Sequence, residues 1–337
     1  MTLNPKSPNF FIIGAPKCGT TAMAHYLAEH PQIYFCAPKE PFFWSTDHAK
    51  LRETHRLHSV DDYLKLFRNA DPSRHAAIGE GSTNYMQSRV AVKEIVKFQP
   101  EARFVVMLRN PVDVAYGMHG ELRRHFAEDE PNFEKAWALQ QPRSQGKQLP
   151  KNDRMINQLQ YQDVATFAPQ LKRLFDQVPE SRRLVLIFDD FAKDPRQCYL
   201  QTLQFLGLTD DGRTDFPKVN PAGKYRSQLI GKIYQDPPKL LSYPVGIFKT
   251  WYAKQGGRLR HLIHGLVQQK APRESLSPEF REYLKSVFAD DIAETSAMIG
   301  RDLSAWVSPN QTSSAQGNID ASKARVTKAR MESAGAQ

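Results

Sequence analysis

The chain has 337 residues, of which 40% are hydrophobic and 24% charged, which is ample for a buried core and ordinary for a globular enzyme. No stretch approaches the ~18–20 apolar residues of a membrane-spanning helix, so we expect neither a helical anchor nor secretion. The formal charge of +10 suits nucleic acid, an anionic membrane surface or a small polyanion. Phosphate-type motifs favour the small polyanion, and we expect no nucleic-acid partner.

The cysteines bear on the compartment of the protein. Cys18, Cys36 and Cys198 are odd in number and lack the close spacing of metal ligands. A disulfide framework and a zinc site are therefore disfavoured, and the cytoplasm is the expected location. A lysine and a helix N-terminus beside Cys18 can lower the pKa of its thiol. We favour the simpler interpretation, in which Cys18 is only a small residue that the loop tolerates.

The first predicted elements form a strand, a loop and a helix. Residues 10–13 are a short apolar, partly β-branched run that predicts a buried strand, Gly14 permits a tight turn, and a helix begins near Thr20. Backbone N–H groups of residues 18–21 can face one anion at the positive end of that helix. Lys17 lies inside the loop rather than directly before the hydroxyl residues, which suits a monophosphate better than a triphosphate.

The next elements alternate strand and helix. Residues 33–35 predict a short strand that leads into the segment KEPFFW at 39–44. Mixed charge and helical spacing predict a helix within residues 46–70, and residues 76–79 predict another short strand. Residues 87–98 have the apolar spacing of a helix.

A cation ends the most continuous apolar run. Residues 103–108 predict a buried parallel strand, and Arg109 follows it directly. An arginine stands here where a triphosphatase commonly carries a magnesium-binding aspartate, so this strand end is suited to an anion. Pro111 marks the start of the following helix.

The second half begins with polar elements. Residues 130–153 predict an exposed helix and loop, and residues 158–175 a helix interrupted or kinked at Pro169. Residues 184–188 predict a further strand, followed by the acidic pair Asp189-Asp190. Residues 194–206 predict a helix that Gly207 ends.

The C-terminal third is basic. Residues 218–234 are basic, and residues 246–270 interleave apolar and basic side chains. That second stretch fits an anionic membrane surface or a cover over an acceptor site, but a solvated helix with one core face is the interpretation we prefer. A strong helix is expected within residues 277–306, and residues 308–337 have almost no large apolar side chains and should be a disordered polar tail.

Four separated segments together resemble one family. They are the loop APKCGTT with KEPFFW, the strand end LRNPVDVAY, the basic segment VNPAGKYRS and the helix end IGRDLSAW. Their order and spacing resemble the sulfotransferases that use 3′-phosphoadenosine 5′-phosphosulfate (PAPS), specifically the heparan-type carbohydrate group and its soluble bacterial relatives. The resemblance implies an α/β fold, a single domain over residues 1–307 with a central parallel sheet flanked by helices, the P-loop-like sulfotransferase fold.

The resemblance also implies roles for individual residues. PAPS would be the sulfuryl donor, no metal would be needed, and a hydroxyl of a carbohydrate, glycolipid or small metabolite would be the acceptor. Glu40 matches the glutamate of the family's KEP motif and would be the general base, while Lys17 would stabilise the leaving phosphate oxygen. The 5′-phosphate would be held by Lys17, Cys18, Gly19, Thr20 and Thr21, and the 3′-phosphate by Arg109.

One position departs from the family pattern. The family usually places a serine eight residues after the arginine, and this chain has Gly117. The contact that the serine hydroxyl would make with the 3′-phosphate is therefore either lost or replaced by a backbone N–H, Lys224, Arg226 or Ser227. This departure bears on the affinity for the cofactor more than on its identity.

Alternative interpretations stay open. Glu80 and His119 are rival bases. A P-loop kinase would use ATP with magnesium bound at Asp189, although the position of Lys17 disfavours it. A non-catalytic basic module for membranes or polyanions would explain the charge but gives Glu40 and Lys17 no purpose. The sequence carries no signal for the oligomeric state.

Overall fold

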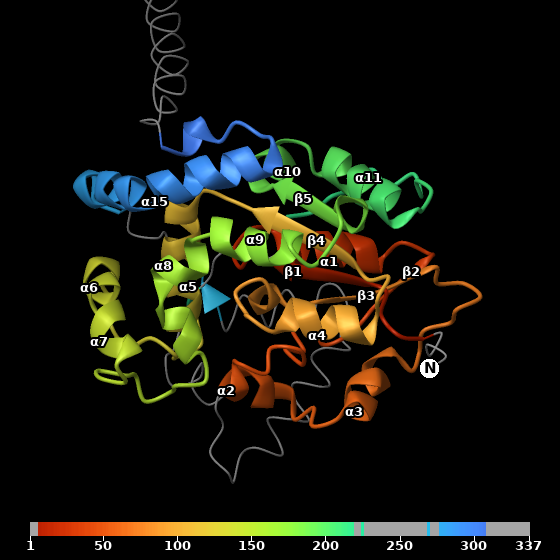
Figure 1. Cartoon of the computed structure of the whole chain (residues 1–337), viewed down its shortest axis with the longest axis horizontal. Coiled ribbons are helices and arrows are strands. Elements are labelled where there is room, and N and C mark those ends of the chain that lie inside the picture. The colour runs from red at the N-terminus through yellow and green to blue at the C-terminus, as the bar shows by residue number, and fades with distance from the viewer. Residues whose placement is uncertain (1–5, 219–223, 226–267, 270–275, 308–337) are drawn as a thin grey trace, which may run out of the picture.

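A five-stranded parallel sheet forms the centre of the protein (Figure 1). The computed structural model describes residues 6–218, 224–225, 268–269 and 276–307. Within them the strands lie in the order β2-β3-β1-β4-β5, so β1 is the central strand and is paired with β3 and β4. The strands are β1 (Phe10–Gly14), β2 (Ile33–Phe35), β3 (Ala77–Gly81), β4 (Arg103–Leu108) and β5 (Arg183–Ile187).

Helices flank this sheet, which confirms the predicted α/β class. The long ones are α1 (Thr20–Ala28), α4 (Ala91–Phe98), α5 (Pro111–Arg124), α9 (Ala168–Phe175), α11 (Pro195–Leu206) and α15 (Pro278–Ile299). Helix α15 packs against α9 and α5, although it lies far from both in the sequence (Figure 1). Since parallel strands present their carboxyl ends at one edge, the loops after β1, β2, β3 and β4 meet there.

The predicted strands are confirmed to within a few residues. Each is a short apolar run, and every residue of β1 and β3 is buried. Phe188, expected as the last residue of the fifth strand, instead begins α10 (Phe188–Lys193). Parallel strands covered on both faces require such continuous apolar runs, which is why the sequence revealed them.

The helix predicted within residues 46–70 is wrong. The structure has four short pieces there: α2 (Ala49–Arg52), η1 (Glu53–His55), α3 (Val60–Leu64) and η2 (Lys65–Phe67). Arg56 ends the first pair with φ 52°, a left-handed conformation that no helix continues through. Ser59 then starts α3 with a capping box, accepting the N–H of Asp62 while the Asp62 carboxylate accepts the N–H of Ser59.

The helical stretch predicted at 158–175 is interrupted rather than kinked, but the interruption does not lie at Pro169. Helix α8 (Tyr161–Ala165) ends before α9 begins, and Pro169 lies in the first turn of α9. A proline costs nothing there, because the first-turn N–H groups have no partner within the helix. The break therefore precedes Pro169.

The stretch 130–153, expected to be exposed, is partly buried. It forms α6 (Phe133–Ala138) and α7 (Gln140–Ser144), and Phe133 and Trp137 lie in the core. Arg143 is buried and paired with the equally buried Glu128 at 2.8 Å. Buried charges need such a partner, so this segment is anchored in the fold.

The last described helix agrees with the sequence at both ends. Ser277 caps α15 by accepting the N–H of Phe280, and Gly300 ends it with φ 63°. The 3₁₀ helix η7 (Ser304–Trp306) follows, and Trp306 is buried. The tail 308–337 lies outside the described residues, so the domain boundary after residue 307 stays a prediction.

We predict that Gly79→Ala destabilises the sheet. A Cβ at position 79 would lie 2.1 Å from Cζ of Phe10, whose ring is fully buried against Phe35. Overpacking of this kind costs about 1–3 kcal/mol, so the urea midpoint should fall with no change in the m-value. Adding Phe10→Leu should restore part of the loss. A wild-type midpoint for Gly79→Ala would contradict this packing.

Candidate active site

The loop between β1 and α1 is held against the end of β4. The N–H of Ala15 donates to the carbonyl of Met107 at 2.8 Å. Gly19 is the N-cap of α1 with φ 89°, a conformation that favours glycine. The first-turn N–H groups of α1 therefore point out of the helix beside the ends of the two central strands, as a bound anion requires.

The side chain of Lys17 reaches from this loop to α5. Its φ is 64°, in the left-handed region, and its side chain runs across Gly117. A Cβ at position 117 would lie 3.2 Å from both Cβ and Cγ of Lys17. The glycine that replaces the expected serine thus leaves room for the Lys17 side chain, whose Nζ pairs with a carboxylate oxygen of Glu121 at 2.9 Å.

Glu121 is shared by the side chains of Lys17, Arg124 and His125. Besides Lys17, it pairs with Arg124 and lies 3.0 Å from Nε2 of His125. Burial raises the pKa of Glu121, but the His125 hydrogen bond and the charges of Lys17 and Arg124 outweigh it and hold that pKa well below its usual range. Glu121 is therefore an anion that anchors the end of the Lys17 side chain.

Glu40 is held from β3 and the turn after it. Its backbone N–H donates to the carbonyl of Gly81, and its φ is 66°. One carboxylate oxygen accepts the N–H of Thr83 at 2.8 Å and lies 3.2 Å from the Thr83 hydroxyl. The carboxylate also pairs with Lys39, and the Glu40 side chain remains 26% exposed. It is anchored yet accessible.

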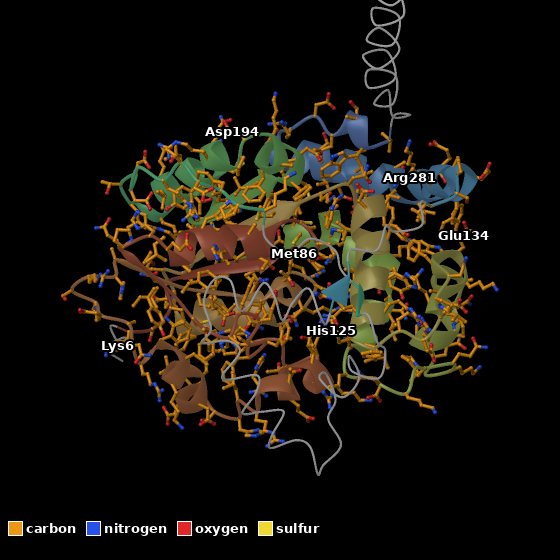
Figure 2. The ribbon with its side chains drawn as sticks, turned by 180° about the vertical axis from the view of Figure 1, so that it is seen from behind. Lys6, Met86, His125, Glu134, Asp194 and Arg281 are labelled. Carbon is orange, nitrogen blue, oxygen red and sulfur yellow. The ribbon has the colours of Figure 1, made fainter. Side chains whose placement is uncertain are left out.

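Thr83 connects Glu40 to the first loop. It begins η3 (Thr83–Tyr85), and its carbonyl lies 3.3 Å from where a Cβ of Gly14 would be. The N–H of Met86, which follows η3, donates to the carbonyl of Ile13 at 2.9 Å. Figure 2 labels Met86 near the centre of the view. In the folded protein Thr83 thus lies between Glu40 and the end of β1, where the loop starts.

Backbone strain is concentrated in these two loops. Six described non-glycine residues have positive φ, and three of them, Lys17, Glu40 and Phe42, lie here. Such conformations cost about 1–3 kcal/mol each and persist only where the surroundings enforce them. Their presence at both loops favours a functional site.

Arg109 borders the other side of the loop. Its guanidinium lies over the ring of Phe188 at 4.6 Å, and the same ring is 3.1 Å from where a Cβ of Gly19 would be. Arg109 pairs with Asp113 at 3.2 Å, and Arg281 of α15 reaches the other oxygen of that carboxylate at the same distance. Figure 2 labels Arg281 on α15. Two guanidinium groups thus share one carboxylate, which leaves net positive charge here.

The remaining loop residues differ in exposure. Cys18 and Thr20 are buried, whereas Thr21 is exposed. Burial raises the pKa of the Cys18 thiol despite the nearby charges of Arg109 and Lys17. The suggestion of a lowered thiol pKa is therefore wrong, and Cys18 is a neutral packing residue of the loop.

The two rival bases are unsuited to that role. Glu80 is 0% exposed, so its carboxyl cannot touch an acceptor in this structure. His119 is buried, with Nε2 2.9 Å from the carbonyl of Glu130 and its ring against Phe133 and Tyr161. Burial lowers the pKa of His119. It is a structural histidine.

The acidic pair after β5 is engaged by the C-terminal segment. The indole N–H of Trp306 donates to Asp189 at 2.8 Å, and Arg301 pairs with Asp190 at 2.9 Å. These contacts give both carboxylates a structural use. Nothing in their surroundings favours the kinase alternative.

The late basic segment is described only in part. Lys224 lies in β6 (Lys224–Tyr225), which pairs with β7 (Gln268–Gln269). Arg226 and Ser227 lie outside the described residues, as does most of the stretch 246–270. Their predicted roles in cofactor binding or at a membrane stay predictions.

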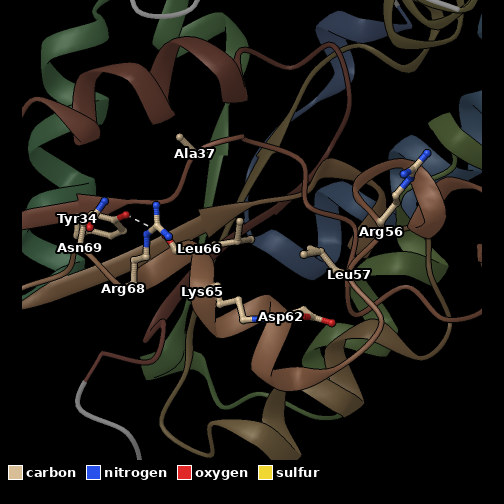
Figure 3. A pocket seen from close by; sticks show the side chains of 9 residues that line it. All are labelled: Tyr34, Ala37, Arg56, Leu57, Asp62, Lys65, Leu66, Arg68 and Asn69. Carbon is tan, nitrogen blue, oxygen red and sulfur yellow. Dashed lines mark hydrogen bonds and ion pairs between the residues drawn. The ribbon is translucent and has the colours of Figure 1, made fainter. Parts of the chain in front are cut away.

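A surface cavity of about 450 Å³ lies apart from these loops (Figure 3). It is lined by none of the predicted site residues, and its nearest approach along the chain is Ala37, three residues before Glu40. The lining residues are Tyr34, Ala37, Arg56, Leu57, Asp62, Lys65, Leu66, Arg68 and Asn69.

The described part of the chain contains neither a cluster of metal ligands nor a membrane-crossing helix. No three His, Cys, Asp or Glu side chains there are placed to share a metal ion. No helix there combines the length and the apolar character that crossing a membrane requires.

The structure also shows residues that sequence reasoning missed. Thr83, Glu121 and Phe188 contact Glu40, Lys17 and Arg109, respectively. Glu121 could have been predicted from the sequence, because it lies one helical turn after Gly117 on the same face of α5. Thr83 and Phe188 carried no signal beyond their positions at strand ends.

Comparison with known proteins agrees with this geometry. Residues 8–212 match the model of the sulfotransferase family. The alignment with carbohydrate sulfotransferase 15 of Mus musculus is 146 residues long at 34% identity, and it covers 32% of this chain and 26% of that protein. The human bifunctional heparan sulfate N-deacetylase/N-sulfotransferase 3 is 26% identical over 201 residues, 60% of this chain and 22% of that protein. The chain thus spans about a quarter of the length of these relatives.

A solved structure shows the same fold. The sulfotransferase from Alicyclobacillus acidocaldarius superposes with a TM-score of 0.64 at 26% identity, covering 89% of this chain and 98% of that one. The parallel sheet, the phosphate-type loop and the matched family model lead to one conclusion: the chain belongs to the sulfotransferase family.

Proposed function

We propose that this protein transfers a sulfuryl group from PAPS to a hydroxyl of a carbohydrate, glycolipid or small metabolite. The observation that carries the proposal is that Thr83 binds Glu40 from a turn whose Ser82 and Met86 donate their N–H groups to the carbonyls of Ile12 and Ile13, just before the Lys17 loop. A carboxylate and a cation are thereby brought to one strand edge beside a helix N-terminus. Sulfuryl transfer needs this combination, a base for the acceptor and positive charge for the leaving phosphate.

Glu40 is the proposed general base. Its carboxylate is exposed enough to meet an acceptor hydroxyl and is aimed by the N–H and hydroxyl of Thr83. A base held in this way can remove the acceptor proton as the new bond to sulfur forms. Lys39 balances its charge.

Lys17 is the proposed cation at the leaving group. Charge grows on the bridging oxygen as the bond to sulfur breaks, and an ammonium group already in place stabilises it without reorganisation. The Glu121 contact holds Lys17 Nζ beside the loop. Lys17 is therefore positioned by two features of α5, the space at Gly117 and the charge at Glu121.

The donor set fits the two phosphates of PAPS. The N–H groups at the start of α1 and the hydroxyls of Thr20 and Thr21 suit the 5′-phosphate. Arg109, stacked on Phe188, suits the 3′-phosphate because guanidinium binds phosphate through two parallel hydrogen bonds. When bound, PAPS supplies the activated sulfuryl group, and every proton is handled by the chain's own residues.

A carbohydrate is the acceptor class that the relatives favour. The matched proteins are named as a carbohydrate sulfotransferase and a heparan sulfate N-sulfotransferase. We extend that class to this chain as part of the proposal. Peripheral membrane contact by the basic stretch 246–270 stays the alternative to the solvated helix that we prefer. The cytoplasmic location stays a prediction.

Labelled PAPS tests the proposed function. We expect label to pass from PAPS to a hydroxylated acceptor within a panel of oligosaccharides, glycolipids and small metabolites. Transfer should persist with a chelator, since Lys17, Arg109 and the start of α1 supply the positive charge. Failure of every acceptor class, with PAPS bound, would contradict the proposal.

Arg109→Ala should weaken binding of adenosine 3′,5′-bisphosphate, the spent cofactor. Loss of a charge-assisted bidentate contact costs about 1.5–3 kcal/mol, so the dissociation constant should rise roughly tenfold to 10²-fold. Arg103→Ala is not a suitable control because Arg103 bonds the carbonyl of Leu206. Lys93→Ala, on the exposed face of α4, removes an equal charge and should leave the affinity unchanged. Equal affinities for Arg109→Ala and wild type would contradict the assignment.

A further inference from the structure

A buried carboxyl lies beneath the segment that carries Glu40. Glu80 is in β3, is fully buried, and neither of its carboxyl oxygens has a hydrogen-bond partner among the described residues. An unpaired buried carboxyl is costly, and its presence in a native fold calls for an explanation. The location of Glu80 suggests an explanation, because the next residue in β3, Gly81, accepts the N–H of Glu40.

The Glu40 segment is attached to hydroxyl groups that surround Glu80. The N–H of Phe42 donates to the Ser82 hydroxyl at 3.1 Å, and the N–H of Trp44 donates to the Tyr85 hydroxyl at 3.2 Å. Both hydroxyls lie close to the Glu80 carboxyl. The segment on either side of Phe43 is therefore tied down at two points, and the hydroxyl at each point lies near the same buried carboxyl.

A third hydroxyl comes from the opposite side. The Tyr63 ring stacks on Phe43 at 4.7 Å and meets Trp44 edge-on at 5.3 Å. The Tyr63 hydroxyl is buried and has no hydrogen-bond partner among the residues that the structure describes, and it too lies close to Glu80. A hydroxyl that accepts a backbone N–H still has a proton to donate, and Glu80 is the nearby acceptor for these protons.

Burial determines the charge of Glu80. It raises the pKa of Glu80 from 4.5 to about 8, against the lowering effect of the hydroxyls, and the charge of Glu40 raises it further. A carboxyl with this pKa is protonated at neutral pH, and a protonated carboxyl is able both to donate and to accept a hydrogen bond. The titratable and charged groups around it are Tyr63 of α3, Tyr85 of η3, and Cys36, Lys39 and Glu40 of the loop after β2.

We propose that protonated Glu80 is a positioning residue, which orients the hydroxyls that hold the Glu40 segment in place. Ionisation of Glu80 would put a buried negative charge near the charge of Glu40, and the carboxyl could then accept hydrogen bonds but no longer donate one. The segment then loses its fixed geometry, and transfer slows. The catalytic part of this inference rests on the proposed function, whereas the protonation of Glu80 does not.

The kinetic test compares pH profiles. In wild type and in Glu101→Gln, which removes an exposed carboxylate, kcat should fall as the pH rises through about 8. In Glu80→Gln that alkaline fall should be absent, because the amide cannot ionise. Glu80→Ala should lower kcat on the order of 10- to 10²-fold at neutral pH with bisphosphate binding retained, and glutamine should restore most of it. An alkaline fall shared by wild type and Glu80→Gln overturns the proposal, as does parallel loss of kcat and bisphosphate binding in Glu80→Ala.

A stability measurement separates this inference from the proposed function. Between pH 4.5 and about 8 the folded state holds the Glu80 proton and the unfolded state does not, so the thermal midpoint of wild type should decline with rising pH. The thermal midpoint should decline less steeply with pH in Glu80→Gln, and as steeply in Glu101→Gln as in wild type. If no sulfuryl transfer occurs but these slopes hold, the proposed function fails and protonated Glu80 stands. Equal slopes in wild type and Glu80→Gln overturn the inference whether or not transfer occurs.

Discussion

Replacing Glu40 by glutamine should abolish most turnover while leaving the cofactor site intact. The amide keeps the shape of the side chain, and its oxygen can still accept the Thr83 N–H, but it cannot take a proton. Loss of a positioned general base lowers kcat by about 10²- to 10⁴-fold. The measurement is steady-state transfer from PAPS, together with the dissociation constant for adenosine 3′,5′-bisphosphate.

The matched control for Glu40→Gln is Glu53→Gln. Glu53 lies in η1, close along the chain but exposed. Its replacement removes the same charge and should leave kcat at the wild-type level. Wild-type turnover in Glu40→Gln would exclude Glu40 as the base. Loss of bisphosphate binding in parallel with turnover would show instead that Glu40 supports the fold of the site.

Lys17→Ala should produce the other large loss. Removing a preorganised donor at a developing negative charge lowers kcat by about 10²- to 10³-fold. The loss should appear in kcat more than in cofactor affinity, because charge on the bridging oxygen grows only as the bond breaks. Glu121 keeps Arg124 and His125 as partners, so the fold should survive the substitution.

Lys93→Ala again provides a charge-matched control, and its kcat should equal that of wild type. The two variants should also share the wild-type thermal midpoint. A Lys17→Ala protein with undiminished kcat would contradict the role of Lys17 at the leaving oxygen. In that case the Glu121 contact would be only a structural ion pair.

The sheet was predictable because its information is local. Residues 103–108 form an uninterrupted apolar run, and a strand buried on both faces needs nothing else to be recognised. The segment 46–70 shows the opposite case. Its helical spacing was real, but the left-handed Arg56 and the capping box at Ser59 divide it into short turns. Spacing alone does not reveal such interruptions.

Some residues of the candidate site could also be predicted from local sequence, and others could not. Lys17, Glu40 and Arg109 each stand in a short motif at a strand end, so the sequence could nominate them. Their partners come from distant parts of the chain: Thr83 lies 43 residues after Glu40, and Glu121 lies 104 residues after Lys17. Pairings of this kind depend on which strands become neighbours in the sheet.

The burial of Glu80 could not be predicted either. In the sequence it precedes Gly81 in a polar stretch, and it was a rival candidate for the base. In the sheet it lies on a fully buried strand, next to β1. The same residue type therefore occurs in two environments here, half-buried at Glu40 and fully buried at Glu80, and only the fold distinguishes them.

The central claim is that the loop and Arg109 form a site for a nucleotide with a 3′-phosphate. Calorimetric titration of the wild-type protein with adenosine 3′,5′-bisphosphate and, separately, with ATP and magnesium tests this most directly. We predict tight binding of the bisphosphate without added metal and much weaker binding of ATP. Binding of ATP with magnesium, and none of the bisphosphate, would contradict the account and favour a kinase.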